Sequence, residues 1–140
     1  MSDEIRSQFP KLYFIEIEKQ SLDLKQEVES GFIEYKRTLL HASGRRLLKY
    51  GTQMQYRIGN NSKGQFAIYY IGVDDNGSLV GIAHEDIIPS VQLFHCVAQF
   101  IKASVISCEL ITIITAEKKQ ILKFKVTRKS KSPISESSLL

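Results

Sequence analysis

The sequence predicts a single α+β domain in which two main helices pack on a mixed β-sheet. Three observations support this prediction. The 140 residues are the length of one ordinary domain. The apolar share of 43% and the charged share of 24% are typical of a soluble globular chain and exclude the disordered and fibrous classes. Short β-branched stretches alternate with two amphipathic stretches, in the order strand, helix, hairpin, helix, hairpin.

The first half of the chain contains two expected strands and one expected helix. Residues 12–17 predict a short strand, and the polar residues 19–30 predict a loop or a short helix. Residues 32–40 predict a strand because β-branched and aromatic residues are interleaved with charges. Ser43 is the expected N-cap of an amphipathic helix that ends in the loop at residues 59–64.

The second half predicts two hairpins separated by a helix. Residues 65–73 are nearly all apolar and predict a central strand buried on both faces. An Asn-Gly turn then leads to a returning strand at residues 78–82. Residues 84–102 predict a helix, and residues 105–115 predict another strand. Residues 121–128 alternate apolar and basic side chains, which predicts a half-exposed edge strand with a basic outer face.

The expected organisation is one domain with two flanking segments. Residues 1–26 form an N-terminal segment with a possible short strand, and residues 27–129 form the domain. Residues 130–140 contain five serines and a proline and predict a disordered tail.

Basic residues are concentrated in two blocks. Residues 36–63 contain seven Lys or Arg and no acid, and residues 118–131 repeat this pattern. The intervening stretch is acidic. This arrangement suits a protein that binds a polyanion and keeps carboxylates for another purpose, although basic runs are also found on ordinary solvated faces.

The cysteine content and the N-terminus favour a reducing compartment. Only Cys96 and Cys108 are present, and no signal peptide begins at Met1, so a cytosolic or nuclear setting is expected and a cytoplasmic location is predicted. The longest apolar runs are far shorter than the ~20 residues of a membrane helix, which excludes a membrane span within the chain.

Several signatures of catalytic and nucleotide-binding proteins are absent. The chain has no phosphate-binding loop of the Gly-x-x-x-x-Gly-Lys-Ser/Thr type, no Gly-x-Ser-x-Gly and no Cys-x-x-Cys. His95, Cys96 and Cys108 supply at most three zinc ligands at irregular spacing, and two structural thiols are the preferred interpretation.

Carboxylates provide the candidate site. Glu34 and Lys36 project from the same face of a strand, and Glu29 lies just ahead of it. Asp74 and Asp75 end the expected central strand. If the two strands pair, these carboxylates could converge and hold a magnesium or manganese ion beside a phosphodiester. The alternative is ordinary turn and strand chemistry.

Two segments resemble the Schlafen (AlbA-type) domain. They are Glu29-Ser30-Gly31-Phe32-Ile33-Glu34-Tyr35-Lys36 and, after a helix, Ile71-Gly72-Val73-Asp74-Asp75-Asn76-Gly77. The pattern is similar to Glu-Ser-x-x-x-Glu-Phe-Lys followed by an Ile-Gly-Val-Asp-Asp-x-Gly hairpin. The nearest variant is the N-terminal domain of elongation-factor-Tu-like GTPases of the GTP-binding-protein-1/2 type.

The resemblance implies a metal-dependent endoribonuclease that acts on transfer RNA or on small RNAs such as piRNA precursors. It places Glu29, Glu34 and Asp75 as the catalytic, metal-binding triad and Lys36 as the adjacent base. RNA would then be positioned by basic residues at Arg45, Arg46, Lys49, Lys123, Lys125 and Arg128. Schlafen nucleases have two lobes, and this chain resembles one, so the resemblance also implies a second Schlafen-like lobe, from another copy or from a partner.

Three functions are therefore considered. The leading hypothesis is an RNA-binding subunit of a ribonuclease assembly. The second is a non-catalytic module that contacts RNA or the ribosome, as at the front of a translational GTPase. The third is a structural subunit that completes a partner's nuclease lobe. The Ser-rich end leaves open whether the native chain continues beyond Leu140.

Overall fold

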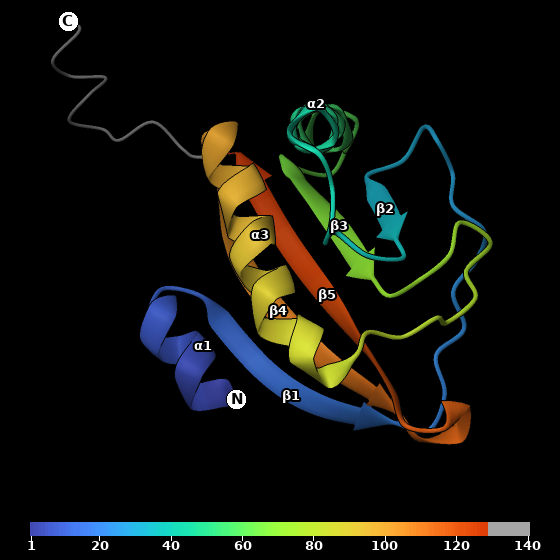
Figure 1. Ribbon diagram of the computed structural model, residues 1–140. Coiled ribbons are helices and arrows are strands. Elements are labelled where there is room, and N and C mark those ends of the chain that lie inside the picture. The colour runs from blue at the N-terminus through green and yellow to red at the C-terminus, as the bar shows by residue number, and fades with distance from the viewer. Residues whose placement is uncertain (129–140) are drawn as a thin grey trace, which may run out of the picture.

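A five-stranded mixed sheet with the helices gathered against it forms the protein (Figure 1). The computed structural model describes residues 1–128. The elements, in chain order, are α1 (Ser2–Gln8), β1 (Tyr13–Lys19), β2 (Ile33–Lys36), α2 (Gly44–Gly59), β3 (Phe66–Ile71), the 3-10 turn His84–Asp86, α3 (Ile87–Phe100), β4 (Ala103–Ile113), the 3-10 turn Ile114–Ala116 and β5 (Lys119–Arg128).

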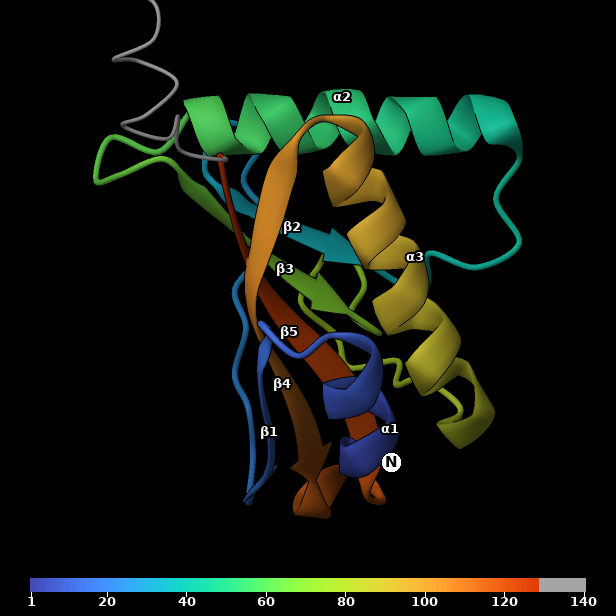
Figure 2. The ribbon, with the colours of Figure 1, turned by 90° about the vertical axis from the view of Figure 1, so that its left-hand side faces the viewer.

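The strand order β1-β4-β5-β3-β2 combines parallel and antiparallel pairs. β1 runs parallel to β4 and β2 runs parallel to β3, whereas β5 is antiparallel to both β3 and β4. Figure 2 shows α1 and α3 on one side of the sheet, α2 across one end, and the segment that links β1 to β2 on the other side.

Aromatic side chains fill the space between the helices and the sheet. Phe94 of α3 stacks on Phe124 of β5 with ring centroids 4.0 Å apart, and it meets the edge of Tyr69 of β3 at 5.1 Å. A smaller apolar cluster on the opposite face, around Tyr35, Val73, Ile111, Ile113 and Ile121, is covered by Leu22 and Leu24 of the β1–β2 segment. The helix-covered face of the sheet therefore holds the larger buried cluster, and the other face is covered only in part.

The predicted α+β class with a mixed sheet and two main helices is confirmed. The predicted strand at 12–17 becomes β1, and the predicted strand at 65–73 becomes β3, which pairs in parallel with β2. The strand predicted at 32–40 is shorter than expected, because β2 ends at Lys36. Ser43 caps α2 as expected, and Pro89 lies in the first turn of α3. The N-terminal segment contributes a helix, α1, that the sequence analysis did not predict, and residues 129–140 lie outside the described part.

The prediction that residues 121–128 form an edge strand is wrong, because β5 is the middle strand of the sheet. An incompletely covered sheet face produces the same alternation of apolar and basic side chains in a central strand as an edge does. For the same reason β3 is not buried on both faces: Ala67, Tyr69 and Ile71 are buried, whereas the residues between them are half-buried.

The predicted returning strand at 78–82 is also wrong, because the hairpin closes with a single bridge between Val73 and Leu79. The main-chain N–H groups of Val80 and Gly81 both donate to the carbonyl of Gly72, at 2.8 and 2.9 Å. Gly72 and Gly81 have positive φ angles, 97° and 87°, which turn the chain out of an extended ladder. This segment is therefore a compact turn rather than a strand.

No helix among the described residues 1–128 has the length and apolar character needed to cross a membrane.

Candidate functional site: a basic pocket beside an acidic cavity

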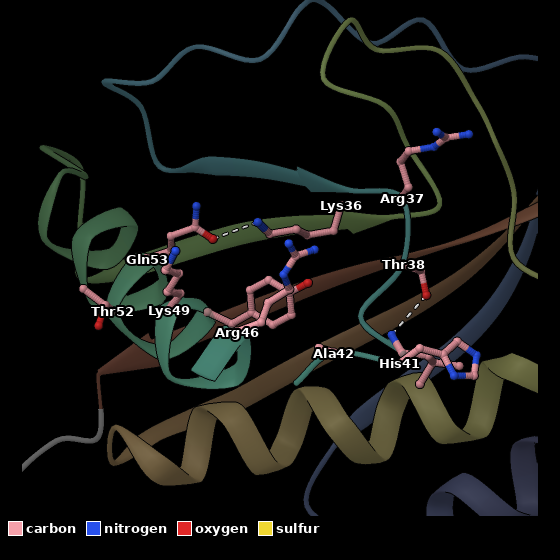
Figure 3. A pocket seen from close by; sticks show the side chains of 11 residues that line it. Lys36, Arg37, Thr38, His41, Ala42, Arg46, Lys49, Thr52 and Gln53 are labelled. Carbon is pink, nitrogen blue, oxygen red and sulfur yellow. Dashed lines mark hydrogen bonds between the residues drawn. The ribbon is translucent and has the colours of Figure 1, made fainter. Parts of the chain in front are cut away.

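A pocket of about 700 Å³ opens where β2 ends and α2 begins (Figure 3). Its walls come from the end of β2, the connecting loop and the N-terminal half of α2. The residues that line it are Lys36, Arg37, Thr38, Leu40, His41, Ala42, Arg46, Lys49, Tyr50, Thr52 and Gln53. Ligands of α/β sheets often bind outside the carboxyl ends of parallel strands, and β2 and β3 are such a pair.

The first turns of α2 form one wall of this pocket. The Ser43 hydroxyl accepts a hydrogen bond from the Arg46 main-chain N–H at 3.2 Å and so fixes the first turn of α2. Helical spacing then places Arg46, Lys49 and Gln53 on one face of the helix. These three side chains project into the same pocket because they lie about one turn apart.

The pocket is strongly electropositive. None of its lining residues is acidic, and none of the ion pairs found within residues 1–128 involves Arg46 or Lys49. Arg37 pairs with Asp74 at 3.2 Å, but this pair is exposed and contributes little stability. The N-terminal end of α2 adds the positive end of the helix dipole. The arrangement can bind an anion such as a phosphate group.

Lys36 separates the basic pocket from a second cavity. Its Nζ donates to Gln53 Oε1 at 2.8 Å, lies 3.5 Å from Glu34 Oε2 and stands 4.8 Å from the Tyr50 ring centroid. Figure 3 shows the Lys36 side chain reaching along the pocket towards Gln53. The lysine thus connects the basic pocket with the carboxylate of Glu34.

The second cavity, of about 320 Å³, is acidic. It is lined by Glu27, Glu29, Glu34, Gln53, Tyr56 and Arg57. At its inner end the buried Arg57 donates through Nε to Glu34 Oε1 at 2.9 Å. Its Nη1 donates to three main-chain carbonyls, those of residues 28, 29 and 31, at 2.7, 2.9 and 2.8 Å. Arg57 therefore fastens the segment ahead of β2 to α2.

Burial perturbs two acidic groups near Arg57. Desolvation raises the pKa of Glu27, although its carboxylate accepts a hydrogen bond from the Tyr35 N–H at 2.6 Å, and the nearby Glu34 raises it further. Desolvation also raises the pKa of Tyr69, and the charge of Glu34 adds to the effect. The buried Tyr69 hydroxyl has no hydrogen-bond partner within the described residues. Both pKa shifts stabilise the protonated form relative to the same side chain in water.

The predicted metal triad is not assembled among residues 1–128. Glu29 and Glu34 line one cavity, but Glu34 is bonded to Arg57. Asp75 is exposed in the turn after β3, where its main-chain carbonyl accepts from the Glu27 N–H at 2.7 Å. No three His, Cys, Asp or Glu side chains in the described range are grouped to hold a metal ion. The Glu34 carboxylate instead accepts from Arg57 and lies 3.5 Å from the Lys36 ammonium, so these donors are not arranged to hold magnesium or manganese.

The predicted RNA-binding residues fall on separate surfaces. Arg46 and Lys49 line the basic pocket, whereas Arg45 is exposed on α2 and does not line it. Lys123 and Lys125 project from the opposite face of the sheet. There Lys123 lies 3.7 Å from Glu109, and the Lys125 ammonium stands 4.4 Å from the Phe66 ring centroid. Arg128 ends β5 and is exposed.

Sequence reasoning missed three basic residues that shape the two cavities. Arg37 and His41 line the basic pocket because the chain turns there between β2 and α2, and His41 does so with a positive φ of 63°. A signal was available for His41, which lies between the predicted strand at 32–40 and the N-cap Ser43 in a run without acids, whereas Arg37 fell inside that predicted strand. Arg57 carried no such signal, because its partner Glu34 is 23 residues away.

Comparison with known proteins finds similarity to two kinds of protein. The chain is 39% identical over 111 residues to an uncharacterized protein of Acanthamoeba polyphaga mimivirus. The aligned region covers 79% of this chain and 59% of the viral protein. The chain is 40% identical over 82 residues to GTP-binding protein 2 of mouse and of human, which covers 59% of this chain and 13% of those proteins. No family model matches. The chain thus spans only part of each relative, and its similarity to a GTP-binding protein agrees with the second resemblance named above.

Proposed function

We propose that this chain is a non-catalytic RNA-binding module that holds the RNA backbone in the basic pocket. The observation that carries the proposal is the set of basic side chains from β2, the loop and α2 that share one pocket with no acidic lining residue. Phosphate contacts supply most of the sequence-independent affinity for RNA, and they require unpaired Lys and Arg charges. Arg46 and Lys49 meet this requirement because no carboxylate in the described range pairs with them.

The similarity to part of GTP-binding protein 2 supports the module hypothesis over a self-contained enzyme. The matching part is 13% of that protein, which is the share expected of one domain among several. In this proposal the chain contacts RNA or the ribosome, and any nucleotide hydrolysis belongs to other domains. The Schlafen-like assignment, the second lobe and the cytoplasmic location remain predictions.

The arrangement around Glu34 does not favour the ribonuclease hypothesis. Glu34 Oε1 accepts from Arg57 and Glu34 Oε2 lies 3.5 Å from Lys36 Nζ, so a metal ion at Glu34 would compete with two basic side chains. A cleavage assay with manganese and small structured RNAs tests this alternative. Cleavage by the purified chain that Glu34→Gln abolishes would replace the present proposal with the nuclease function.

The binding proposal is tested by two matched charge reversals. In the first variant, Arg46→Glu and Lys49→Glu are combined, and in the second, Lys123→Glu and Lys125→Glu. Fluorescence anisotropy with a labelled single-stranded RNA measures affinity at several salt concentrations, and circular dichroism checks the fold. We expect the first variant to lose about tenfold or more in affinity and to flatten the salt dependence by about two ions, with a much smaller effect for the second. Equal affinity of the first variant and the wild type would overturn the proposal.

A further inference from the structure

We infer that the acidic cavity beside the basic pocket reads a guanine base of the bound RNA, with Glu29 and Gln53 on the base edge and Tyr56 against its ring. This inference rests on the proposed function. It assigns the base-specific part of binding to residues distinct from those that hold the phosphate.

The two cavities lie next to each other along α2 and share Gln53 as a lining residue. Lys36, which donates to the Gln53 side chain, lies at the boundary between them. Lys49, Gln53 and Tyr56 lie on one side of the helix, and the first and last are separated by about 10 Å along the axis at 1.5 Å per residue. A single nucleotide can bridge this distance, with its phosphate near Lys49 and its base near Tyr56.

One carboxylate in the acidic cavity remains available to a ligand. Glu34 is bonded to Arg57, and Glu27 accepts from the Tyr35 N–H and lies 3.8 Å from Arg57. Glu29 is exposed, and within residues 1–128 only its main-chain carbonyl, not its carboxylate, has a hydrogen-bond or ion-pair partner. An ionised carboxylate only accepts hydrogen bonds. Its ligand must therefore present donors.

Tyr56 supplies an aromatic surface at the same place. Its side chain is 55% exposed although it lines the acidic cavity, so its ring contributes little to the core. Unpaired bases of RNA stack on such rings, and this stacking does not depend on sequence. Tyr56 is thus placed to hold a base while the neighbouring polar groups select it.

Guanine is the base whose edge matches these groups. Its N1–H and N2 amino groups are adjacent donors for the Glu29 carboxylate, and its O6 accepts from the Gln53 amide, whose oxygen is already occupied by Lys36. Adenine, cytosine and uracil each present fewer adjacent donors on that edge. The two adjacent cavities also fix the orientation of the nucleotide, because the carboxylates repel phosphate and the basic pocket attracts it.

The test compares oligouridylates that carry one central guanosine, inosine or adenosine. Inosine lacks only the N2 amino group, so it isolates one donor. Anisotropy titrations use the wild type, Glu29→Gln, Tyr56→Leu and, as a matched control, Glu18→Gln on the exposed part of β1. We expect the guanosine RNA to bind the wild type and the control about tenfold more tightly than the inosine RNA. We expect Glu29→Gln to lose this preference and Tyr56→Leu to weaken binding of all three RNAs.

Three outcomes would overturn the inference. Equal binding of the three RNAs by the wild type, still sensitive to Arg46→Glu and Lys49→Glu, would remove base reading and leave the proposed function intact. A guanosine preference that survives Glu29→Gln would place the reading group elsewhere. Absence of binding to any of the RNAs would remove both proposals together.

Discussion

The two halves of α2 carry similar charges and use them differently. In the N-terminal half, Arg46 and Lys49 are exposed, line an open pocket and have no acidic partner among the described residues. In the C-terminal half, Arg57 is 4% exposed and donates to Glu34 and to three main-chain carbonyls. One half of the helix can bind a ligand, whereas the other holds the protein together.

This difference shows that burial decides whether a basic residue is available for binding. A buried arginine must satisfy its donors inside the protein, because an unpaired buried charge is very costly. An exposed lysine or arginine keeps water as its partner and can exchange it for phosphate. Lys123 and Lys125 on the sheet are an intermediate case of availability for binding. Their side chains are partly exposed, but their ammonium groups already lie near a carboxylate or an aromatic ring.

Removal of Arg57 should produce the largest change in stability. Arg57→Met removes the hydrogen bond to the buried Glu34 carboxylate, which keeps only Lys36 nearby, and releases the carbonyls of residues 28, 29 and 31. We expect a loss of about 3–5 kcal/mol in the free energy of unfolding, measured by urea denaturation. Arg57→Lys keeps the charge but not the geometry and should lose less. A loss below about 1 kcal/mol for Arg57→Met would show that the two halves of α2 do not differ in the way described.

Substitutions of Ser43, the N-cap of α2, can distinguish the stability of the N-terminal half of the helix from its affinity for RNA. Ser43→Ala removes the acceptor for the Arg46 N–H and should cost about 1 kcal/mol of stability. Ser43→Asp retains a capping oxygen but adds a negative charge at the edge of the basic pocket. Its thermal stability should therefore stay near that of the wild type, while its RNA affinity falls below that of Ser43→Ala. The opposite ranking of the two affinities would argue against phosphate binding at this end of α2.

Glu27 should give the smallest effect, seen as a pH dependence. Its pKa is raised above 4.5 in the folded protein, mainly by desolvation, so the folded state binds this proton more tightly than the unfolded state. Glu27 therefore contributes more favourably to stability as the pH falls from neutrality through the raised pKa towards 4.5. The free energy of unfolding of the wild type minus that of Glu27→Gln should therefore become more positive as the pH falls over that range. A difference that stays constant or decreases on acidification would contradict the assigned direction.

The fold was more predictable than the site. Apolar spacing in α2 and α3 and the alternation in β5 reveal local structure, because both depend on residues close in sequence. The position of β5 within the sheet depends on which strands pair with it, and alternation does not reveal that. The closing of the β3 hairpin depended on the positive φ angles of Gly72 and Gly81, which a sequence pattern does not specify.

The candidate site shows the same limit. Glu34 was recognised as a special residue and Glu29 was placed near it, and both line the acidic cavity. The sequence could not show that Arg57, 23 residues later, pairs with the Glu34 carboxylate. Arg46 and Lys49 were identified from charge alone, and so were Lys123 and Lys125. Only the tertiary structure separates these pairs, since it places them on different faces of the sheet.

The most direct test of the central claim is a titration of the isotopically labelled chain with a short single-stranded RNA, followed by amide chemical shifts. Binding at the basic pocket predicts that the shifts change at Lys36, His41 and the N-terminal half of α2, with little change at Lys123 and Lys125. Changes confined to β3 and β5 would contradict the account, because they would place the RNA on the open face of the sheet instead.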